Sequence, residues 1–191
     1  LGLRLVGDIF EQFGSGMIFR SFEDRTLGIN NSIEGVFGSY SYENILTLKG
    51  LYGRPRLYTD YTDSWVRGAD LSFSVANLIG WQGIMLNLEG SYVNRNEKIS
   101  DELAELMKPN LDMYSARANF DWNGFNGRVE YVGKGKDVSS ALLGATAKGH
   151  GLLAELGYSN NGFSVLGTYR ELKYMSTKLS LGGSGVGNIL N

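Results

Sequence analysis

In YSARANFDWNGFNGRVEYVGK, residues 114–134, apolar and polar side chains alternate on both sides of one Asn-Gly pair. From Tyr114 to Trp122 every second residue is apolar or aromatic, which is the period of a β-strand with two unlike faces. Asn123-Gly124 tolerates the positive φ angles of a two-residue hairpin turn. Because the alternation resumes at Phe125, the segment predicts an antiparallel hairpin with one apolar and one polar face.

The same pattern recurs on both sides of this hairpin. Leu1 to Phe22 is also strand-like, with a break or bulge at Gly14-Ser15-Gly16. The other predicted hairpins pair residues 34–42 with 46–54, 69–75 with 84–92, and 152–158 with 163–169. We therefore expect an all-β fold of about ten strands in one domain over residues 1–191, arranged as an antiparallel up-and-down meander.

The connections between the predicted strands alternate strictly between short and long. Such alternation of short and long connections is typical of bacterial outer-membrane barrels, which have short periplasmic turns and long extracellular loops. Loop 97–110 is predicted to hold a short helix between Ser100 and Pro109, and residues 176–191 a Gly-rich loop or tail. The tight turns lie at 43–45, 78–81, 123–124 and 160–162, and the longer loops at 23–33, 55–66, 97–110 and 135–150.

Composition excludes several functional classes. Eighteen basic and twenty acidic side chains give a net charge of -2, so nothing in the charge favours a nucleic-acid partner. The absence of Cys excludes a disulfide scaffold, a thiolate metal site and a Cys nucleophile. No apolar run approaches the roughly 18 residues of a membrane-spanning helix. A membrane protein with this sequence would have to be a closed transmembrane β-barrel, or a large part of one, because lipid cannot satisfy free backbone groups.

Aromatic residues favour an outward-facing apolar surface. They bracket aliphatic and small residues in two bands, as at the two interfaces of a bilayer. The segment from Tyr114 to Trp122 would extend about 20 Å along the membrane normal if the strand is tilted by ~40°. This length approaches the ~25 Å height of the apolar band of such barrels. The predicted interface aromatics are Tyr52, Trp81, Tyr92, Trp122, Phe125, Tyr131, Phe163 and Tyr169.

The opposite face of the same strands is charged. Charges in lipid cost several kcal/mol each, so these side chains are expected to line a lumen or to face water. Their mixed signs predict cross-strand ion pairs, with Arg117 or Asp121 meeting Arg128 or Glu130. A ladder that fills a narrow lumen and a conductive pore both fit this pattern. The candidate lumen-lining residues are Lys49, Asp70, Asn87, Glu89, Arg117, Asp121, Arg128, Glu130, Glu155 and Arg170.

The sequence offers little for catalysis. We predict no catalytic residue, no cofactor and no metal site. His150 is the only histidine, so a hydrolase built into the barrel would depend on it, with Asp137, Ser139 and Ser140 nearby. Asp60, Asp63 and Asp70 lack the regular spacing of a calcium loop.

The N-terminal third of the chain contains GDIFEQFGSGMIFRSFEDR at 7–25, LGINNS at 27–32 and GLYGR at 50–54. In these segments it resembles a family of uncharacterised Gram-negative outer-membrane barrel proteins, and the resemblance covers the remainder only by pattern. Members of that family are longer, so the resemblance implies that the chain is a partial or truncated member and its barrel incomplete. It implies an outer-membrane location and carries no agreed activity.

These observations favour a non-enzymatic outer-membrane barrel, either porin-like or a structural component of an envelope transport or secretion assembly. Its partners would be outer-membrane lipid and other envelope proteins. The alternative is a soluble β-barrel that binds an apolar ligand inside. For Phe13 to Arg25, dense in charge and glycine, two interpretations stay open. One is a bulged strand and a structured loop held by ion pairs, and the other is an inward bend that forms a lumen constriction or a partner contact.

Overall fold

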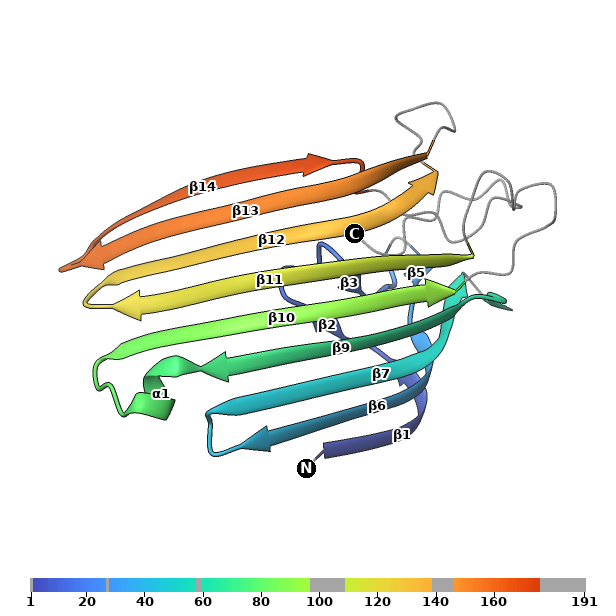
Figure 1. Ribbon diagram of the computed structural model, residues 1–191, viewed down its shortest axis with the longest axis horizontal. Helices are drawn as coiled ribbons and strands as arrows, with labels where there is room; N and C mark the ends of the chain where they lie inside the picture. The colour runs from blue at the N-terminus through green and yellow to red at the C-terminus, as the bar shows by residue number, and fades with distance from the viewer. Residues whose placement is uncertain (1, 27, 58–59, 97–108, 139–145, 176–191) are drawn as a thin grey trace.

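Nine strands of the described part of the chain form one antiparallel meander (Figure 1). The computed structural model describes residues 2–26, 28–57, 60–96, 109–138 and 146–175. In sheet order the strands are β1 (Gly2–Ile9), β6 (Ile33–Tyr42), β7 (Leu46–Leu57), β9 (Trp65–Ser74), β10 (Ile84–Asn96), β11 (Asn110–Trp122), β12 (Phe125–Val138), β13 (Thr146–Asn160) and β14 (Phe163–Lys173).

The all-β antiparallel meander predicted from the alternation is confirmed. Each strand of the path pairs with the strand before and after it, and β1 and β14 form the two edges. Within the described residues the sheet is open and does not close into a barrel, and its path holds nine strands against the ten or so expected.

The tight turns follow the local chemistry that predicted them. Trp122 pairs with Phe125 across Asn123 and Gly124, which have φ angles of +49° and +83°. Residues 160–163 repeat this arrangement, and residues 43 and 44 also adopt positive φ. The turn predicted at 78–81 instead holds a short helix, α1 (Val75–Ile79), which ends at Gly80 in the left-handed conformation. This left-handed glycine is a common way to end a helix.

Several strands run further than the alternation indicates. β12 continues to Val138 and β13 begins at Thr146, so the connection predicted at 135–150 is shorter. A register shift between Lys134 and Lys136 interrupts the period-two pattern there while backbone pairing continues. The predicted helix in 97–110 and the tail at 176–191 fall outside the described residues, apart from 109 and 110.

The long connections near the start of the chain also contain short strands. β8 (Asp60–Tyr61) pairs with the end of β7, inside the loop predicted at 55–66. β4 (Glu23–Asp24) pairs with β5 (Ile29–Asn30), inside the loop predicted at 23–33.

Between β1 and β6 the chain leaves the sheet and folds against its concave face. This inner segment, residues 10–26, includes the two-residue strands β2 (Gln12–Phe13) and β3 (Phe19–Arg20), which pair with each other and lie behind β10 and β11 in Figure 1. The placement of Phe13 to Phe19 against the concave face agrees with an inward bend, and the short strands β3 and β4 (Glu23–Asp24) agree with a structured loop. Constriction of a lumen stays a prediction, because the described sheet is open.

The apolar core lies between the inner segment and the concave face of the sheet. Phe13, Ile18 and Phe19 are completely buried there. The sheet contributes further buried apolar side chains, which lie at inward positions of β6, β7 and β9 to β13, and one more follows β14. They are Ile33, Leu51, Val66, Val93, Leu111, Met113, Val132, Leu153 and Met175.

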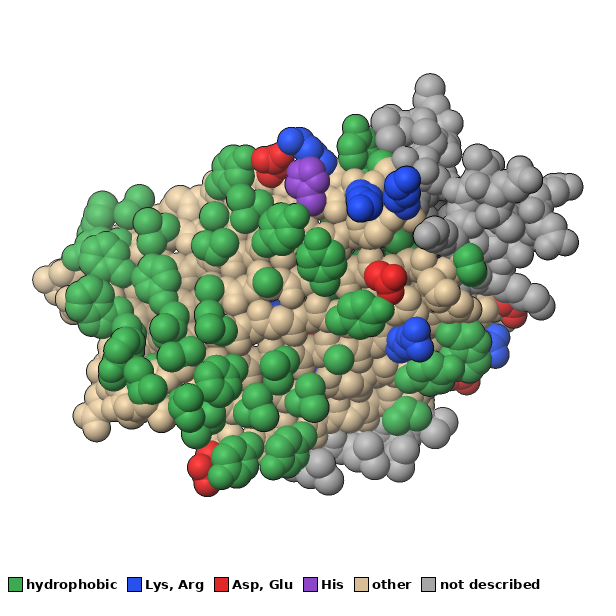
Figure 2. All heavy atoms as spheres, in the orientation of Figure 1, with side chains coloured by type: hydrophobic (Ala, Val, Ile, Leu, Met, Phe, Trp, Pro, Cys, Tyr) green, Lys and Arg blue, Asp and Glu red, His purple; other side chains and the backbone are tan. Residues whose placement is uncertain are grey.

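The convex face carries the other apolar residues, and they are exposed. Figure 2 shows hydrophobic side chains spread over the strands, with most charged side chains near the end of the long connections. The convex face therefore exposes aliphatic and aromatic side chains, whereas the concave face combines an apolar core with buried charged residues. In the described ranges no helix is long and apolar enough to cross a membrane.

Candidate functional site

The ten candidate lumen-lining residues share the concave face. Pairing register sets Glu89 opposite Arg117 and Arg117 opposite Glu130, and antiparallel partners point to the same side of a sheet. Arg128 is likewise opposite Glu155, and Lys49 is opposite Asp70. The shared face that the alternation predicted is therefore present, although only some of these residues touch one another.

Arg117 is the centre of a buried ion cluster on this face. Its guanidinium donates to the Asp70 carboxylate, and its Nε lies 2.7 Å from Glu89 Oε2. Its Nη1 also donates to the Ser91 hydroxyl. Asn119 donates a further hydrogen bond of 3.0 Å to the other oxygen of Glu89. The Arg117 side chain is 1% exposed, and the two carboxylates supply the negative charge and the hydrogen bonds that a buried guanidinium needs.

Glu130 connects this cluster to the inner segment. Its side chain is completely buried, and it accepts hydrogen bonds of 2.9 Å from the Ser115 hydroxyl and from the Ser15 backbone N–H. Arg128 on the same strand lies 3.4 Å from it. The turn at Gly14 and Ser15 is thus held against the strand wall by a charge-assisted hydrogen bond, which is stronger than a neutral one.

One ion pair holds the start of the inner segment, and a second joins β1 to β7 just before it. Lys49 Nζ lies 3.0 Å from Glu11 Oε1, so Lys49 serves the inner segment. At the end with the long connections, Asp8 accepts from the Ser32 hydroxyl at 2.9 Å and pairs with Arg56 at 3.4 Å. The Tyr61 hydroxyl also donates to Asp8, and burial together with that carboxylate raises the pKa of Tyr61.

The predicted ion pairing differs from the observed one. Arg117 pairs with residues of β9 and β10 rather than across its own hairpin, and Asp121 is exposed near the tight turn. Arg170 is exposed on the edge strand β14. Asn87 lines a hollow of about 300 Å³ at the tight-turn end, together with Thr47, Ser72, Ser74 and Asn77.

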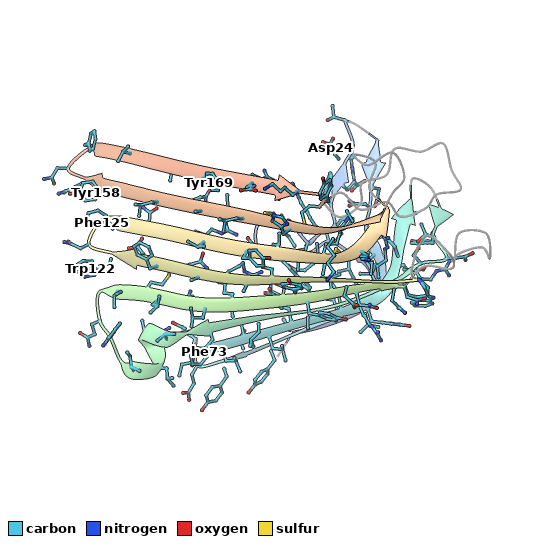
Figure 3. The ribbon with its side chains drawn as sticks, turned by 45° about the horizontal axis from the view of Figure 1, so that its top comes forward. Asp24, Phe73, Trp122, Phe125, Tyr158 and Tyr169 are labelled. Atoms are coloured by element: carbon cyan, nitrogen blue, oxygen red, sulfur yellow. The ribbon has the colours of Figure 1, made fainter. Side chains whose placement is uncertain are left out.

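All eight predicted interface aromatics are exposed. Near the tight turns, Trp122, Phe125 and Tyr158 follow one another across β11, β12 and β13 (Figure 3), and the rings of Phe125 and Tyr158 are 4.5 Å apart. A second group lies towards the long connections, where Tyr52 stacks on Trp65 at 5.1 Å. The exposed members are Tyr52, Trp81, Tyr92, Trp122, Phe125, Tyr131, Phe163 and Tyr169.

Glycines on the convex face accommodate aromatic rings from the neighbouring strand. A Cβ at Gly127 would lie 2.0 Å from the ring of Phe120, and one at Gly133 would lie 2.2 Å from the ring of Tyr114. The rings therefore cover the backbone at these two glycines, an arrangement that helps to fix the register between neighbouring strands.

Sequence reasoning missed the small residues that make the cluster possible. Ser91 and Ser115 lie in register with each other and leave room for the Arg117 side chain to reach Asp70. Gly14 comes so close to Arg117 that a Cβ there would be 2.5 Å from its Nη1. The Gly14-Ser15-Gly16 break was the available signal, because a glycine with positive φ often marks a close backbone approach.

The candidate catalytic and metal-ligating residues are dispersed in the part of the chain that the structure describes. His150 is exposed on β13 and faces Gly133 and Lys173 in register, while Ser139 and Ser140 and the side chain of Asp137 lie outside the described part. Asp70, one of three candidate calcium ligands, is committed to Arg117. Across the residues that the structure describes, no three His, Asp or Glu side chains gather as a metal site.

Comparison with known proteins identifies a family without an assigned role. No curated protein and no solved structure matches the chain. One family model covers residues 4–191, almost the whole sequence. The chain therefore belongs to the family of unknown function described as DUF6029.

Proposed function

We propose that this chain is a non-enzymatic β-barrel protein of the outer membrane, whose lumen is occluded by its own inner segment. It serves as a wall component of an envelope transport or secretion assembly rather than as a freely open pore. Its partners are outer-membrane lipid and other envelope proteins. The resemblance of its N-terminal third to Gram-negative outer-membrane barrels agrees with this location.

The exposed apolar convex face, opposite a concave face with buried charges, carries the proposal. Leu71 and Val129 on the convex face are 43% and 49% exposed, whereas Arg117 and Glu130 on the concave face are 4% and 0% exposed. In water, a nine-strand surface of aliphatic and aromatic side chains far exceeds the apolar patch of an ordinary monomer. In lipid, the same surface is the expected outer face of a barrel, and the aromatic bands match its two interfaces.

The inner segment supports occlusion. Its buried side chains fill the concave face next to Val93, Met113 and Val132, and its backbone is anchored at Glu130. This also argues against the alternative of a soluble barrel with an apolar ligand inside, because the apolar part of the concave face is already occupied by Phe13 and Phe19.

Tryptophan fluorescence tests the proposal on the unmodified chain. Trp65, Trp81 and Trp122 are its only tryptophans, and all three are exposed. We expect the protein to need detergent in solution. In phosphatidylcholine vesicles with brominated acyl chains its emission should be strongly quenched, while aqueous iodide has little effect. A protein that is monodisperse without detergent and insensitive to brominated lipid would contradict the proposal.

Planar-bilayer recording tests the occlusion. An inserted protein with its inner segment in place should conduct far less than an open porin of similar strand number. A steady conductance of porin size from the unmodified chain would mean that the segment does not occlude the lumen.

A further inference from the structure

Two lysines face each other across neighbouring strands on the convex face of the sheet. Lys136 of β12 is opposite Lys148 of β13 in the pairing register, and both side chains are exposed. Residues that are directly opposite on one face of an antiparallel pair have Cβ atoms about 4.5–5.5 Å apart. Like charges at this distance destabilise a sheet, so packing of the strands does not by itself account for the pair.

A bulge in β12 places the second lysine on the convex face. The register of β12 on β13 shifts between Lys134 and Lys136, where two residues of β12 correspond to one step of β13. Lys134 is opposite the buried Met113 and is itself 3% exposed, on the concave face. Regular alternation would direct residue 136 to that same side. The extra residue, Gly135, therefore brings Lys136 to the convex face, opposite Lys148.

Two further basic side chains extend this group across a third strand. His150 is the next residue of β13 on the convex face after Lys148, and Lys173 of β14 is opposite His150. Figure 2 shows basic side chains near the one histidine of the chain, towards the end with the long connections. Two strand spacings and two residues along a strand measure about 10 Å by 7 Å, so one phosphate group can contact several of these side chains. We call Lys136, Lys148, His150 and Lys173 the basic patch.

The two carboxylates described beside the basic patch have partners of their own. Glu171 Oε1 lies 2.5 Å from Lys173 Nζ. Asp112, next to Gly135 on the neighbouring strand, accepts a hydrogen bond of 2.5 Å from the Tyr92 hydroxyl. Within the described ranges, neither of these carboxylates forms an ion pair with the two opposed lysines. The positive charge of the opposed lysines is therefore available to an anion from outside the chain.

The basic patch lies at the border of the apolar band on the convex face. Tyr131 precedes Lys136 on β12, and Tyr114 covers Gly133 between them. Interfacial tyrosines lie at the level of the lipid head groups, and lysines near the ends of membrane strands direct their ammonium groups into the same layer. In the proposed barrel, the basic patch would thus face the head groups of one leaflet.

We infer that the basic patch binds the phosphate of an anionic lipid head group, in the leaflet on the side of the long connections. The inference rests on the proposed membrane location and names the class of lipid that this part of the sheet selects. A phosphate monoester carries about −1.5 to −2 charges near pH 7 and has three acceptor oxygens, and lysine binds phosphate as a point charge. A phosphate between Lys136 and Lys148 would also offset the repulsion across the two strands.

Spin-labelled lipids test the inference on protein inserted into phosphatidylcholine vesicles. The measurement compares how much spin-labelled phosphatidic acid and how much spin-labelled phosphatidylcholine the protein immobilises. We expect phosphatidic acid to associate at least about threefold more strongly with the unmodified chain. Lys136→Gln/Lys148→Gln should abolish this preference, and Lys136→Arg/Lys148→Arg should retain it. The matched control, Arg20→Gln/Arg25→Gln, removes the same charge from exposed residues of the inner segment and should also retain it.

The opposite results overturn the inference. An equal preference in the unmodified chain and in Lys136→Gln/Lys148→Gln would show that the opposed lysines do not select the lipid. Loss of the preference in millimolar inorganic phosphate, but not in sodium chloride of equal ionic strength, would indicate a site for free phosphate instead. Absence of any preference in protein whose tryptophans are quenched by brominated lipid would reject the lipid site and leave the membrane location standing. Protein that brominated lipid does not quench would overturn the membrane location and the lipid site together.

Discussion

Gly14 in the inner segment faces the ion cluster with no room for a side chain. A Cβ at this position would lie 2.5 Å from both Arg117 Nη1 and Glu130 Oε1, and its φ is +58°. Gly28 has a similar φ of +66°, but a Cβ added there would have nothing within 4 Å. Substituting Gly28 therefore introduces the backbone strain without the steric clash. We expect Gly14→Ala to lose about 1–3 kcal/mol more unfolding free energy than Gly28→Ala, measured by urea in detergent micelles. Equal losses would show that the close approach is unimportant.

Arg117 compensates two carboxylates that have little access to water. Replacing it by Met leaves Asp70 and Glu89 without their cation, so Arg117→Met should cost about 3–5 kcal/mol of unfolding free energy. The triple change Arg117→Met, Asp70→Asn, Glu89→Gln should recover part of that loss, because the buried charges are removed together. Arg25→Met, at a side chain 87% exposed, is the control. Similar stabilities of the two single variants would contradict the role given to Arg117.

At the scale of single elements, the inner segment is the part whose removal should change transport. Phe13 is completely buried, and Gly68 on β9 makes room for its ring, since a Cβ there would lie 2.8 Å from Phe13. Phe13→Ala should loosen the segment and raise single-channel conductance in planar bilayers severalfold over the unmodified protein. Phe10→Ala, in the same segment but at a residue 46% exposed, should leave conductance unchanged. If neither variant conducts more, the segment does not control the lumen.

The hairpins were predictable from sequence because their signals are local. Asn123-Gly124 and Asn161-Gly162 have the backbone freedom that a two-residue turn needs, and period-two alternation beside them sets the faces of the strands. The inner segment could not be placed in this way. Its position depends on Phe13 meeting strands more than fifty residues away, and alternation within residues 10–26 contains no trace of that contact.

The sequence predicted which face of the sheet carries the candidate site residues, but not which of these residues contact one another. Alternation placed all ten charged or amide side chains on one side of the sheet. It could not show that Arg117 reaches past Glu89 to Asp70 on the next strand but one, because that depends on the small side chains of Ser91 and Ser115. Nor could it show that Lys49 serves the inner segment through Glu11.

For the molecule as a whole, a lysine introduced on the convex face of the sheet should impair membrane insertion more than a lysine introduced on the concave face. Val129 and Asn126 both lie on β12, on the convex and the concave face respectively. A lysine on the lipid face near the bilayer midplane costs about 2–4 kcal/mol, whereas on the inner face it meets water. Val129→Lys should therefore reduce insertion into vesicles at least tenfold, measured by flotation, and Asn126→Lys should insert normally. Equal insertion of the two variants would contradict the assignment of the faces.

The most direct test of the membrane-facing sheet is a spin-label scan along β12 in lipid vesicles, one cysteine at a time from Phe125 to Lys134. Accessibility to oxygen, which concentrates in lipid, and to an aqueous nickel chelate is measured at each position. We predict that oxygen accessibility peaks at Phe125, Val129 and Tyr131 and is low at Arg128, Glu130 and Val132, with a period of two. A scan with the opposite phase, or without a period, would contradict an apolar convex face in contact with lipid.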